Sequence, residues 1–507
     1  MLKRTVFTLG AVTAAARVTM AASSALPGKE ARPNIIFIMA DDLGFSDLRC
    51  FGGEAATPNL DRLAAEGVRF SQYYNCGKCE PTRAALMTGH RNTPQIGFLA
   101  ERAKTFMPAV LKDQGYRTIL SGKWHVSRHP LDRGFERFFG MEEGACDYYT
   151  GSGRLQLGRE KFPVPAEGFY TTDAFTDQAL KFLDEANTQN DAQPFFLYLA
   201  YNAPHTPLQA PEEEMAKYCG KYLEGWEVFK ERRFKRIKEL GLIPPESKMP
   251  LWPQNLPHWN ELTDSQKKDE DLRMATYTAM IDRMDQNIGR VLQWLDKTGE
   301  RENTLIVFVS DNGATPFGGA GTGWAHVSGT PFRLYKRNQH EGGICAPMIM
   351  RGSASGYAAG SISTMPVHVL DFLPTFYALA GGTGRPEDIE GADLSGLWKT
   401  AAQNRDYEMM SYLVDHRYIR RNDWKLVSVD GQPWELYNVA RDRTETDNLI
   451  AKNPEKAQEL QSAWEKWYGT FSKKEFEVGK VSKRSRMGDQ GSGVRYDPSA
   501  SPKTEEE

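Results

Sequence analysis

The stretch NIIFIMADD, residues 34–42, sets a short apolar run directly before two adjacent aspartates. Three later runs have the same form: YRTILSGK at 116–123, PFFLYLAY at 194–201 and TLIVFVSD at 304–311. Each of them ends in polar residues or is followed by them. Short continuous apolar runs are typical of strands in a parallel sheet, because helices cover both faces of such a sheet.

Helix signals lie between these runs. In TPNLDRLAAEG, residues 57–67, Thr57 is suited to cap a helix, Pro58 to its first position and Gly67 to its end. Strands that alternate with helices predict an α/β fold with a large, mostly parallel sheet sandwiched by helices. In such sheets functional side chains gather beyond the carboxyl ends of the strands.

The beginning of the chain indicates export. Lys3 and Arg4 precede an apolar stretch at 6–16, and small residues follow up to Ala25. This is the pattern of a secretory signal peptide over residues 1–25, so we expect a periplasmic or secreted protein. The net charge of the 507 residues is only −3 and no long basic stripe occurs, so we expect no nucleic-acid partner. No later run reaches the ~18 to 20 apolar residues of a membrane span, so we expect no membrane partner either.

The remaining chain divides by its composition. The main α/β domain is predicted over residues 30–400 and contains an insert at 211–300, which combines charged helices with a Pro/Trp-rich stretch. Residues 401–475 change to the pattern of a smaller domain, with antiparallel strands followed by a helix. Residues 476–507 lack periodicity and are predicted to form a loose tail.

The insert carries one helix with an apolar face that should pack on the sheet. The residues on this face are Tyr277, Ile281, Met284, Ile288 and Leu295. The insert also holds three tryptophans, Trp226, Trp252 and Trp259. They are suited to stack on a sugar or an aryl ring, although packed tryptophans are the commoner outcome.

Two pairs of oxygen ligands stand at two strand ends. Asp41 and Asp42 repel each other, and a shared cation is one common way to hold such a pair ionised. Asp311 and Asn312 offer two further oxygens after the run at 304–311. Either pair alone could simply cap a turn. Two such pairs, with no His or Cys among them, favour a hard divalent ion, Ca²⁺ or Mg²⁺, over zinc.

Cys79 admits two interpretations. It completes a C-x-x-C with Cys76, the pattern of a redox dithiol or of half a zinc site, but the sequence offers no second C-x-x-C or close His pair for zinc. It also stands at the mouth of a predicted helix, in which Pro81 takes the first position. On that helix Arg83 lies on the same face as Cys79, near an N-terminus that attracts anions. This arrangement suits a tetrahedral oxyanion.

Basic side chains complete the predicted site. Lys123 and His125 lie two apart in an extended segment, His205 follows the run at 194–201, and Lys336 comes later in the chain. A single histidine at a strand end is more often structural than catalytic. Two histidines, two lysines and an arginine that converge with four hard oxygen ligands indicate a site that transfers a sulfuryl or phosphoryl group.

The motif around Cys79 resembles that of the type I sulfatases of the alkaline phosphatase superfamily. The family motif Cys-x-Pro-Ser/x-Arg-x-x-x-x-Thr-Gly directs oxidation of its cysteine to Cα-formylglycine, and residues 79–89 read CEPTRAALMTG. Thr82 stands where Ser is commoner. The resemblance implies that a formylglycine-generating enzyme matures Cys79, and that thiol chemistry plays no part in the mature enzyme.

Further motifs follow in the family's order from about residue 33 to 470. The resemblance implies one calcium ion per chain, with ligands from Asp41, Asp42, Asp311, Asn312 and the modified side chain of Cys79. It implies that the catalytic groups are Cys79, Arg83, Lys123, His125, His205 and Lys336. Lys336 precedes Glu341-Gly342-Gly343 by five residues, as the family's last sulfate-binding lysine does, although Leu334-Tyr335 replace the usual glycines. The insert is most similar to that of bacterial arylsulfatases.

The mechanism that the resemblance implies uses a hydrate of the formylglycine. One of its hydroxyls attacks sulfur while Ca²⁺, Arg83, Lys123 and Lys336 hold the sulfate oxygens. His205, with one lysine, protonates the leaving oxygen, and His125 takes a proton from the second hydroxyl so that sulfate is released. The expected activity is hydrolysis of aryl or carbohydrate sulfates, so the expected partner is a small-molecule or saccharide sulfate ester.

Two other functions stay open from the sequence. A phosphodiester or phosphonate monoester hydrolase of the same superfamily would use the same cradle, and relative rates on matched sulfate and phosphate esters separate it from a sulfatase. A non-catalytic protein that binds sulfated glycans would leave Cys79 unoxidised or bonded to Cys76. The mass of the peptide that contains Cys79 separates this alternative.

Overall fold

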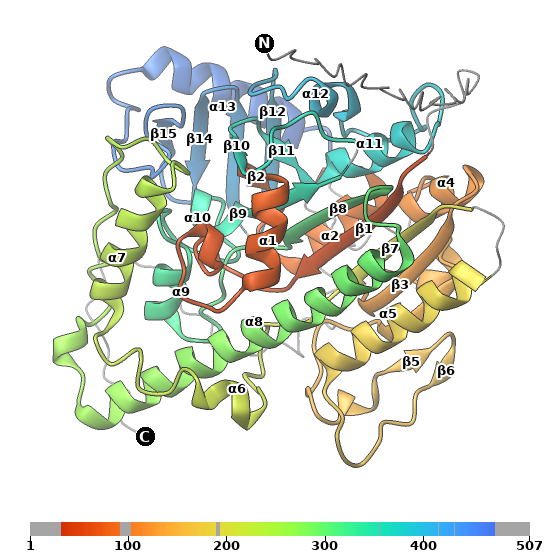
Figure 1. The fold of residues 1–507 in the computed structure, drawn as a ribbon. Helices are drawn as coiled ribbons and strands as arrows, with labels where there is room; N and C mark the ends of the chain where they lie inside the picture. The colour runs from red at the N-terminus through yellow and green to blue at the C-terminus, as the bar shows by residue number, and fades with distance from the viewer. Residues whose placement is uncertain are drawn as a thin grey trace, which may run out of the picture. The chain divides into compact units, whose positions relative to one another are not determined.

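The computed structural model describes residues 32–91, 103–188, 193–352, 354–413, 415–429 and 431–471. The predicted signal peptide and the predicted tail lie outside these residues. The described part of the chain forms one large sheet with helices and a second, smaller sheet (Figure 1). No helix within it is both long and apolar enough to cross a membrane.

The large sheet has 11 strands among the described residues, in the order β10-β2-β9-β8-β1-β7-β3-β4-β5-β6, with β11 paired to β2. Its strands are β1 (Asn34–Ala40), β2 (Val68–Tyr74), β3 (Arg117–Lys123), β4 (Arg137–Met141), β5 (Gln156–Leu157), β6 (Glu160–Lys161), β7 (Phe195–Ala200), β8 (Thr304–Ser310), β9 (Cys345–Arg351), β10 (Ser361–Ser363) and β11 (Val367–His368). The pairs that include β9 or β5 are antiparallel and the others are parallel. The predicted fold class, a mixed and mostly parallel sheet, is confirmed.

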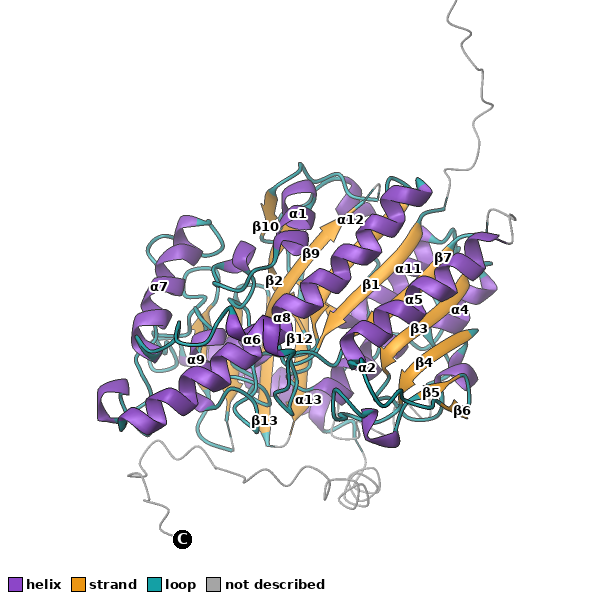
Figure 2. Ribbon diagram, turned by 60° about the horizontal axis from the view of Figure 1, so that its bottom comes forward, coloured by secondary structure: helices purple, strands orange, loops and turns teal. Residues whose placement is uncertain are grey.

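Helices cover both faces of this sheet. Figures 1 and 2 show α5 and the long α8 across one face, with α1 beside α8, while α2, α4 and α11 pack on the other. The helices are α1 (Pro58–Glu66), α2 (Cys79–Thr88), α4 (Met107–Asp113), α5 (Thr171–Thr188), α6 (Glu212–Ala216), α7 (Trp226–Glu239), α8 (Asp264–Thr298), α9 (Thr322–Ser328), α10 (Glu341–Ile344), α11 (Phe372–Leu379), α12 (Ser395–Lys399) and α13 (Pro454–Tyr468).

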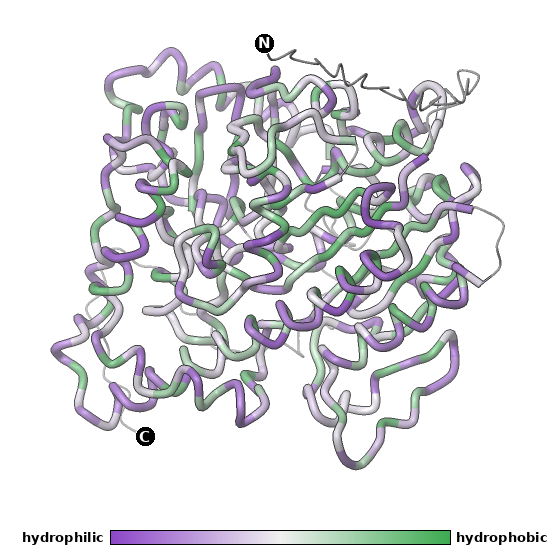
Figure 3. The backbone as a smooth tube through the Cα atoms, viewed as in Figure 1, coloured by the Kyte–Doolittle hydropathy of each residue, from purple (hydrophilic) through white to green (hydrophobic). Residues whose placement is uncertain are grey.

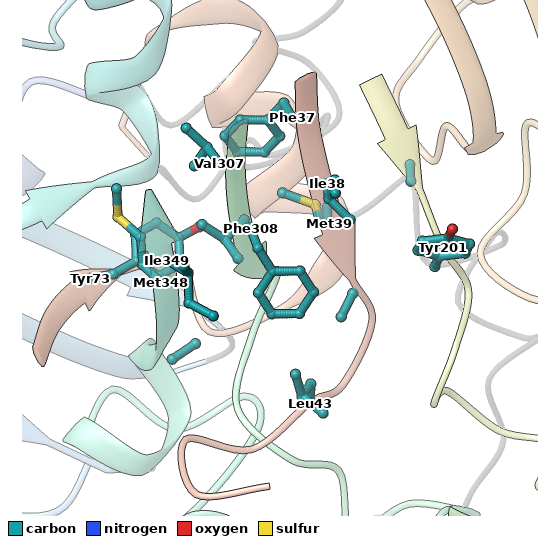
Figure 4. Packing of buried hydrophobic residues seen from close by; sticks show 14 of the residues in the cluster. Phe37, Ile38, Met39, Leu43, Tyr73, Tyr201, Val307, Phe308, Met348 and Ile349 are labelled. Carbon is teal, nitrogen blue, oxygen red and sulfur yellow. The ribbon is translucent and has the colours of Figure 1, made fainter. Parts of the chain in front are cut away.

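The central strands form the core. Figure 4 shows Phe37 and Ile38 of β1 beside Val307 and Phe308 of β8, their partners in the parallel register. Phe37 also packs edge-on against Phe372 of α11, with ring centroids 4.8 Å apart. All these side chains are fully buried, and each contributes about 1.5–3 kcal/mol through the hydrophobic effect. The central strands are accordingly the most hydrophobic part of the chain in Figure 3.

Strand register determines where the polar residues meet. Ala40 lies opposite Ser310 in the β1–β8 pair, so Asp41 and Asp311 follow at the same level. The β1–β7 and β3–β7 registers bring the ends of β7 and β3 to the same edge of the sheet. The segments that follow four neighbouring strands therefore converge there.

The smaller sheet is antiparallel, in the order β12-β13-β14-β15. Its strands are β12 (Glu408–Leu413), β13 (His416–Arg421), β14 (Trp424–Ser428) and β15 (Glu435–Asn438). One face packs on α13 and buries Ile419, Leu426 and Leu436, while Tyr418 and Val427 of the other face belong to the core of the large sheet. The predicted antiparallel C-terminal sheet is confirmed, but the domain bounds at 30–400 and 401–475 stay predictions.

The start of α1 and the packing of the insert agree in part with the sequence. Helix α1 begins at Pro58 as expected, but the side chain of Thr57 makes no capping hydrogen bond and accepts one from the Arg49 N–H instead. The five residues of the apolar face predicted in the insert are all buried on α8. The three tryptophans of the insert pack on one another, since the Trp226 ring stacks on Trp252 and meets Trp259 edge-on.

Candidate active site

The two predicted pairs of oxygen ligands form one cluster. Asp41 and Asp42 directly follow β1, Asp311 and Asn312 directly follow β8, and all four side chains are fully buried. Asp42 has a φ of 67°, a conformation that is uncommon outside glycine. In this conformation its N–H donates to Asp311 Oδ1 at 3.3 Å, and Asn312 Nδ2 donates to Asp42 Oδ1 at 2.6 Å.

Cys79 is the first residue of α2, and its side chain lies close to this cluster. The Cys79 Sγ and carboxylate oxygens of Asp41 and Asp311 all lie within 4.8 Å of one another. The helix begins at Cys79, so the expectation that Pro81 takes the first position was wrong by two residues. The Cys79 thiol is free, so it forms no disulfide with Cys76.

Arg83 links α2 to β3, to β7 and to Asp311 after β8. Its Nε and Nη2 donate to Asp311 Oδ2 at 3.0 and 2.8 Å, and its Nη1 donates to the Lys123 carbonyl at 3.0 Å and the Tyr198 hydroxyl at 3.2 Å. The guanidinium is fully buried, and Nη2 also lies 3.9 Å from Asp41 Oδ2. Most of its donors are therefore committed to holding the carboxylates and the end of β3.

Two lysines neutralise the adjacent aspartates. Lys123 Nζ lies 2.5 Å from Asp41 Oδ2, and Lys336 Nζ lies 2.6 Å from Asp42 Oδ1. Burial alone would raise the pKa of Asp42, but Lys336 and His205 outweigh it and lower that pKa below its usual value. Burial opposes the charge on Lys336, yet the neighbouring Asp42 raises the pKa of this lysine. Both ends of this pair are therefore charged at neutral pH.

The cluster retains acceptors that could hold a cation. Asp41 Oδ1, Asp42 Oδ2 and Asn312 Oδ1 are buried and accept no hydrogen bond from any described residue. A buried polar atom without a partner is costly. Oxygen donors of this kind, with three carboxylates close together, fit a hard divalent cation such as Ca²⁺ better than zinc.

His205 faces the carboxylates from the loop after β7. Its Nδ1 lies 2.7 Å from the Thr206 carbonyl oxygen, which can only accept, so Nδ1 carries a proton. Its Nε2 lies 3.6 Å from Asp42 Oδ2. This ring is therefore oriented with Nε2 toward the site.

The segment from Lys123 to His125 differs from the extended conformation that was predicted. Strand β3 ends at Lys123, and His125 has a φ of 50°, so the segment between them is not extended. The His125 N–H donates to the Glu142 carbonyl oxygen at 3.1 Å, which fixes this turn. Burial and the charge of Lys123 lower the pKa of His125 to about 3. The ring is therefore neutral at physiological pH.

Three hydroxyl groups support the site and were not predicted. The Tyr198 hydroxyl accepts a hydrogen bond from Arg83 Nη1. The Tyr277 hydroxyl donates to the Asp42 carbonyl at 3.0 Å, and the Ser310 hydroxyl accepts from the Leu43 N–H at 3.1 Å. The sequence pattern assigned Tyr277 to the core face of its helix and Tyr198 to a buried strand. Both assignments are correct, but periodicity cannot show what a buried hydroxyl bonds to.

Gly313 allows a close contact next to Asn312. A Cβ at position 313 would lie 1.9 Å from the Gly342 carbonyl oxygen, a backbone atom that cannot rotate away. We expect Gly313→Ala to destabilise the protein by about 1–3 kcal/mol or more, the usual cost of overpacking, and to weaken metal binding. Gly396→Ala is the matched control, because a Cβ there meets nothing within 4 Å. Equal thermal stability of the two variants would contradict this account.

Comparison with known proteins identifies the family. A family model described as Sulfatase matches residues 33–382, and one described as N-sulphoglucosamine sulphohydrolase, C-terminal, matches residues 332–469. The first match covers more than half of the chain. The chain therefore belongs to the sulfatase family, as the resemblance of its motifs implied, and is a sulfuric ester hydrolase.

Individual relatives agree with this. The chain is 33% identical to the arylsulfatase of Klebsiella aerogenes, covering 73% of this chain and 91% of the relative. It is 30% identical to the N-acetylglucosamine-6-O-sulfatase of Bacteroides thetaiotaomicron, covering 85% of each chain. The crystal structure of Ps i-CgsB in complex with k-i-k-neocarrahexaose matches with a TM-score of 0.68 at 28% identity, covering 90% of this chain and 99% of that one.

Proposed function

We propose that this sulfatase cleaves sulfate monoesters with a nucleophile derived from Cys79 and with one calcium ion held at the strand ends. The observation that carries the proposal is the convergence of Cys79 with Asp41 and Asp311 within 4.8 Å. Asp41, Asp42, Asp311 and Asn312 would hold the ion, with the modified side chain of Cys79. Formylglycine at position 79 would, once hydrated by water, supply a hydroxyl nucleophile, and bound Ca²⁺ would stabilise charge on the sulfate oxygens.

The remaining residues divide the work of binding and proton transfer. The ammonium groups of Lys123 and Lys336 are buried beside the carboxylates, where they can also attract the sulfate oxygens. Arg83 would act chiefly by fixing Asp311 and the end of β3. His205 would donate a proton to the leaving oxygen, while the neutral ring of His125 would accept one from the second hydroxyl of the hydrate, so that sulfate is released.

We further propose a sulfated carbohydrate as the natural substrate. Two proteins similar to this chain support it: the N-acetylglucosamine-6-O-sulfatase, and Ps i-CgsB, whose crystal structure contains k-i-k-neocarrahexaose. The likeness to an arylsulfatase makes an aryl sulfate a useful assay substrate. The direct test compares rates of the matured protein on sulfated sugars, on an aryl sulfate and on the matched phosphate esters. Faster hydrolysis of the phosphate esters would favour the phosphodiester or phosphonate monoester alternative.

His205 and His125 are expected to differ in their dependence on the leaving group. A nitrophenolate leaves readily without help, whereas a sugar alkoxide is a poor leaving group. His205→Ala should therefore lose most of the ~10²- to 10⁴-fold worth of general acid catalysis on sugar sulfates, and much less on an activated aryl sulfate. His125→Ala should slow all substrates toward one common rate, because its step follows departure of the leaving group.

The measurement is kcat for both variants across a series of sulfate esters of increasing leaving-group pKa. A flat response for His205→Ala would assign the acid role to Lys123 or Lys336 instead. The intact geometry of each variant is checked by its melting temperature and by its calcium content.

A further inference from the structure

A buried ionic cluster connects the smaller sheet to the segment that carries Lys336. At its centre is Glu341, the first residue of α10, which is fully buried. Lys425 of β14 donates to Glu341 Oε1 at 2.9 Å, and Arg443 donates to Glu341 Oε2 at 3.0 Å. The Tyr74 hydroxyl donates to Glu341 Oε2 at 2.8 Å. Both oxygens of this carboxylate are therefore satisfied, two of the three donors coming from beyond residue 400.

A second carboxylate completes the cluster. Glu445 Oε2 accepts the backbone N–H of Glu341 at 2.9 Å, and Glu445 Oε1 lies 2.8 Å from Lys425 Nζ. Two carboxylates thus face the ammonium of Lys425 and the guanidinium of Arg443. Burial disfavours the charge of Glu341, but Lys425 and Arg443 outweigh it and lower its pKa to about 2. The two carboxylates balance Lys425 and Arg443, and none of these four side chains is more than 5% exposed, so solvent compensates little for the loss of a member.

The segment that Glu341 anchors contacts both halves of the active site. The Gly313 N–H, next to Asn312, donates to the Gly343 carbonyl at 3.1 Å, and the Lys336 N–H donates to the Ala314 carbonyl at 3.0 Å. On the side of Cys79, the segment meets the loop before α2. The Arg337 N–H donates to the Gly77 carbonyl at 2.7 Å. A shift of α10 would therefore move Lys336 relative to both the metal ligands and the nucleophile.

We infer that Lys425, Arg443 and Glu445 are positioning residues for the sulfate site, and that the smaller sheet acts through Glu341 to hold Lys336 and the backbone beside Asn312 in register with Cys79. The inference rests on the proposed roles of Lys336 and of the metal ligands. It assigns a function to the Glu341-Gly342-Gly343 motif and to β14, which the proposed mechanism leaves unused.

The test uses a double variant that keeps the charge balanced. Lys425→Met with Glu445→Gln removes one cation and one anion and leaves the Arg443 to Glu341 ion pair. Tyr74→Phe removes the hydrogen bond to Glu341 and the one that this hydroxyl accepts from Arg420 Nη1, and it serves where the double variant folds poorly. Arg421→Gln is the matched control, because Arg421 pairs with Glu408 in an exposed part of the same sheet.

All variants are assayed well below their melting temperatures, so that lost stability alone does not lower activity. We expect kcat/KM of the double variant on an aryl sulfate to fall by about 10- to 100-fold, the usual effect of a small misplacement at the site. Calcium affinity, measured by calorimetry on chelator-treated protein, should weaken by about tenfold or more. Tyr74→Phe should show the same two changes to a lesser degree, and Arg421→Gln neither.

The inference is overturned if the double variant or Tyr74→Phe folds and still has the kcat/KM and the calcium affinity of the wild type. Lys336→Ala is measured beside them to separate the positioning role from the sulfate site itself. If Lys336→Ala itself stays fully active, the proposed sulfate site is wrong. If Lys336→Ala is inactive while the cluster variants are normal, only the positioning role fails.

Discussion

Cys79→Ala is expected to abolish sulfate ester hydrolysis while leaving the fold intact. Removing a catalytic nucleophile typically costs on the order of 10⁶ in kcat, and alanine places no reactive group beside Asp41 and Asp311, where the Cys79 side chain lies. Alanine fits the first turn of α2 well, because it has the highest helix propensity. The melting temperature should therefore change little.

Cys76→Ala is the matched control for this experiment. Both cysteines are buried and only three residues apart, but Cys76 is not the oxidised position of the motif. Turnover of Cys76→Ala should stay within a few-fold of wild type. An equally severe loss in Cys76→Ala would favour a dithiol role, and near wild-type turnover in Cys79→Ala would exclude the proposed nucleophile. Mass measurement of the peptide that contains residue 79 shows whether the wild-type thiol has been oxidised.

Most of the site could be predicted because it depends on local sequence signals. The apolar run at 34–40 coincides with β1 at both ends, since a strand buried on both faces has sharp polar limits. The polar residues after such strands then meet by the geometry of a parallel sheet. Asp41 and Asp311 are adjacent for this reason, although 270 positions separate them in the chain.

Other features depend on contacts that no local pattern encodes. The antiparallel placement of β9 depends on its pairing with β2 and β8, and the turn at His125 depends on a hydrogen bond to the Glu142 carbonyl. The partners of Glu341 could not be predicted either. Lys425 lies in β14 and Glu445 in the segment after β15, and their sequence context is typical of charges on the surface. Their complete burial is a property of the packed structure alone.

Removal of the divalent cation is expected to abolish nearly all activity. Purified protein should contain Ca²⁺, or Mg²⁺, at about one ion per chain. Three carboxylates lie within the site, and the arginine and two lysines that pair with them leave three buried oxygens that accept no hydrogen bond from any described residue. A divalent cation would satisfy these oxygens and supply several kcal/mol of charge stabilisation to the sulfate, worth about 10³-fold or more in rate.

Asp311→Ala is the variant that tests the calcium site. It removes a proposed metal ligand that also binds Arg83. The variant should lose stoichiometric calcium and at least about 10³-fold in kcat/KM. Asp285→Asn is the control: Asp285 is buried as well, but it accepts the N–H groups of Asn59 and Leu60 at the start of α1. It should lower the melting temperature without changing the calcium content. Stoichiometric zinc in the wild type, or undiminished activity of Asp311→Ala, would contradict the calcium site; chelation that removes calcium and activity together, with recovery on adding Ca²⁺, would support it.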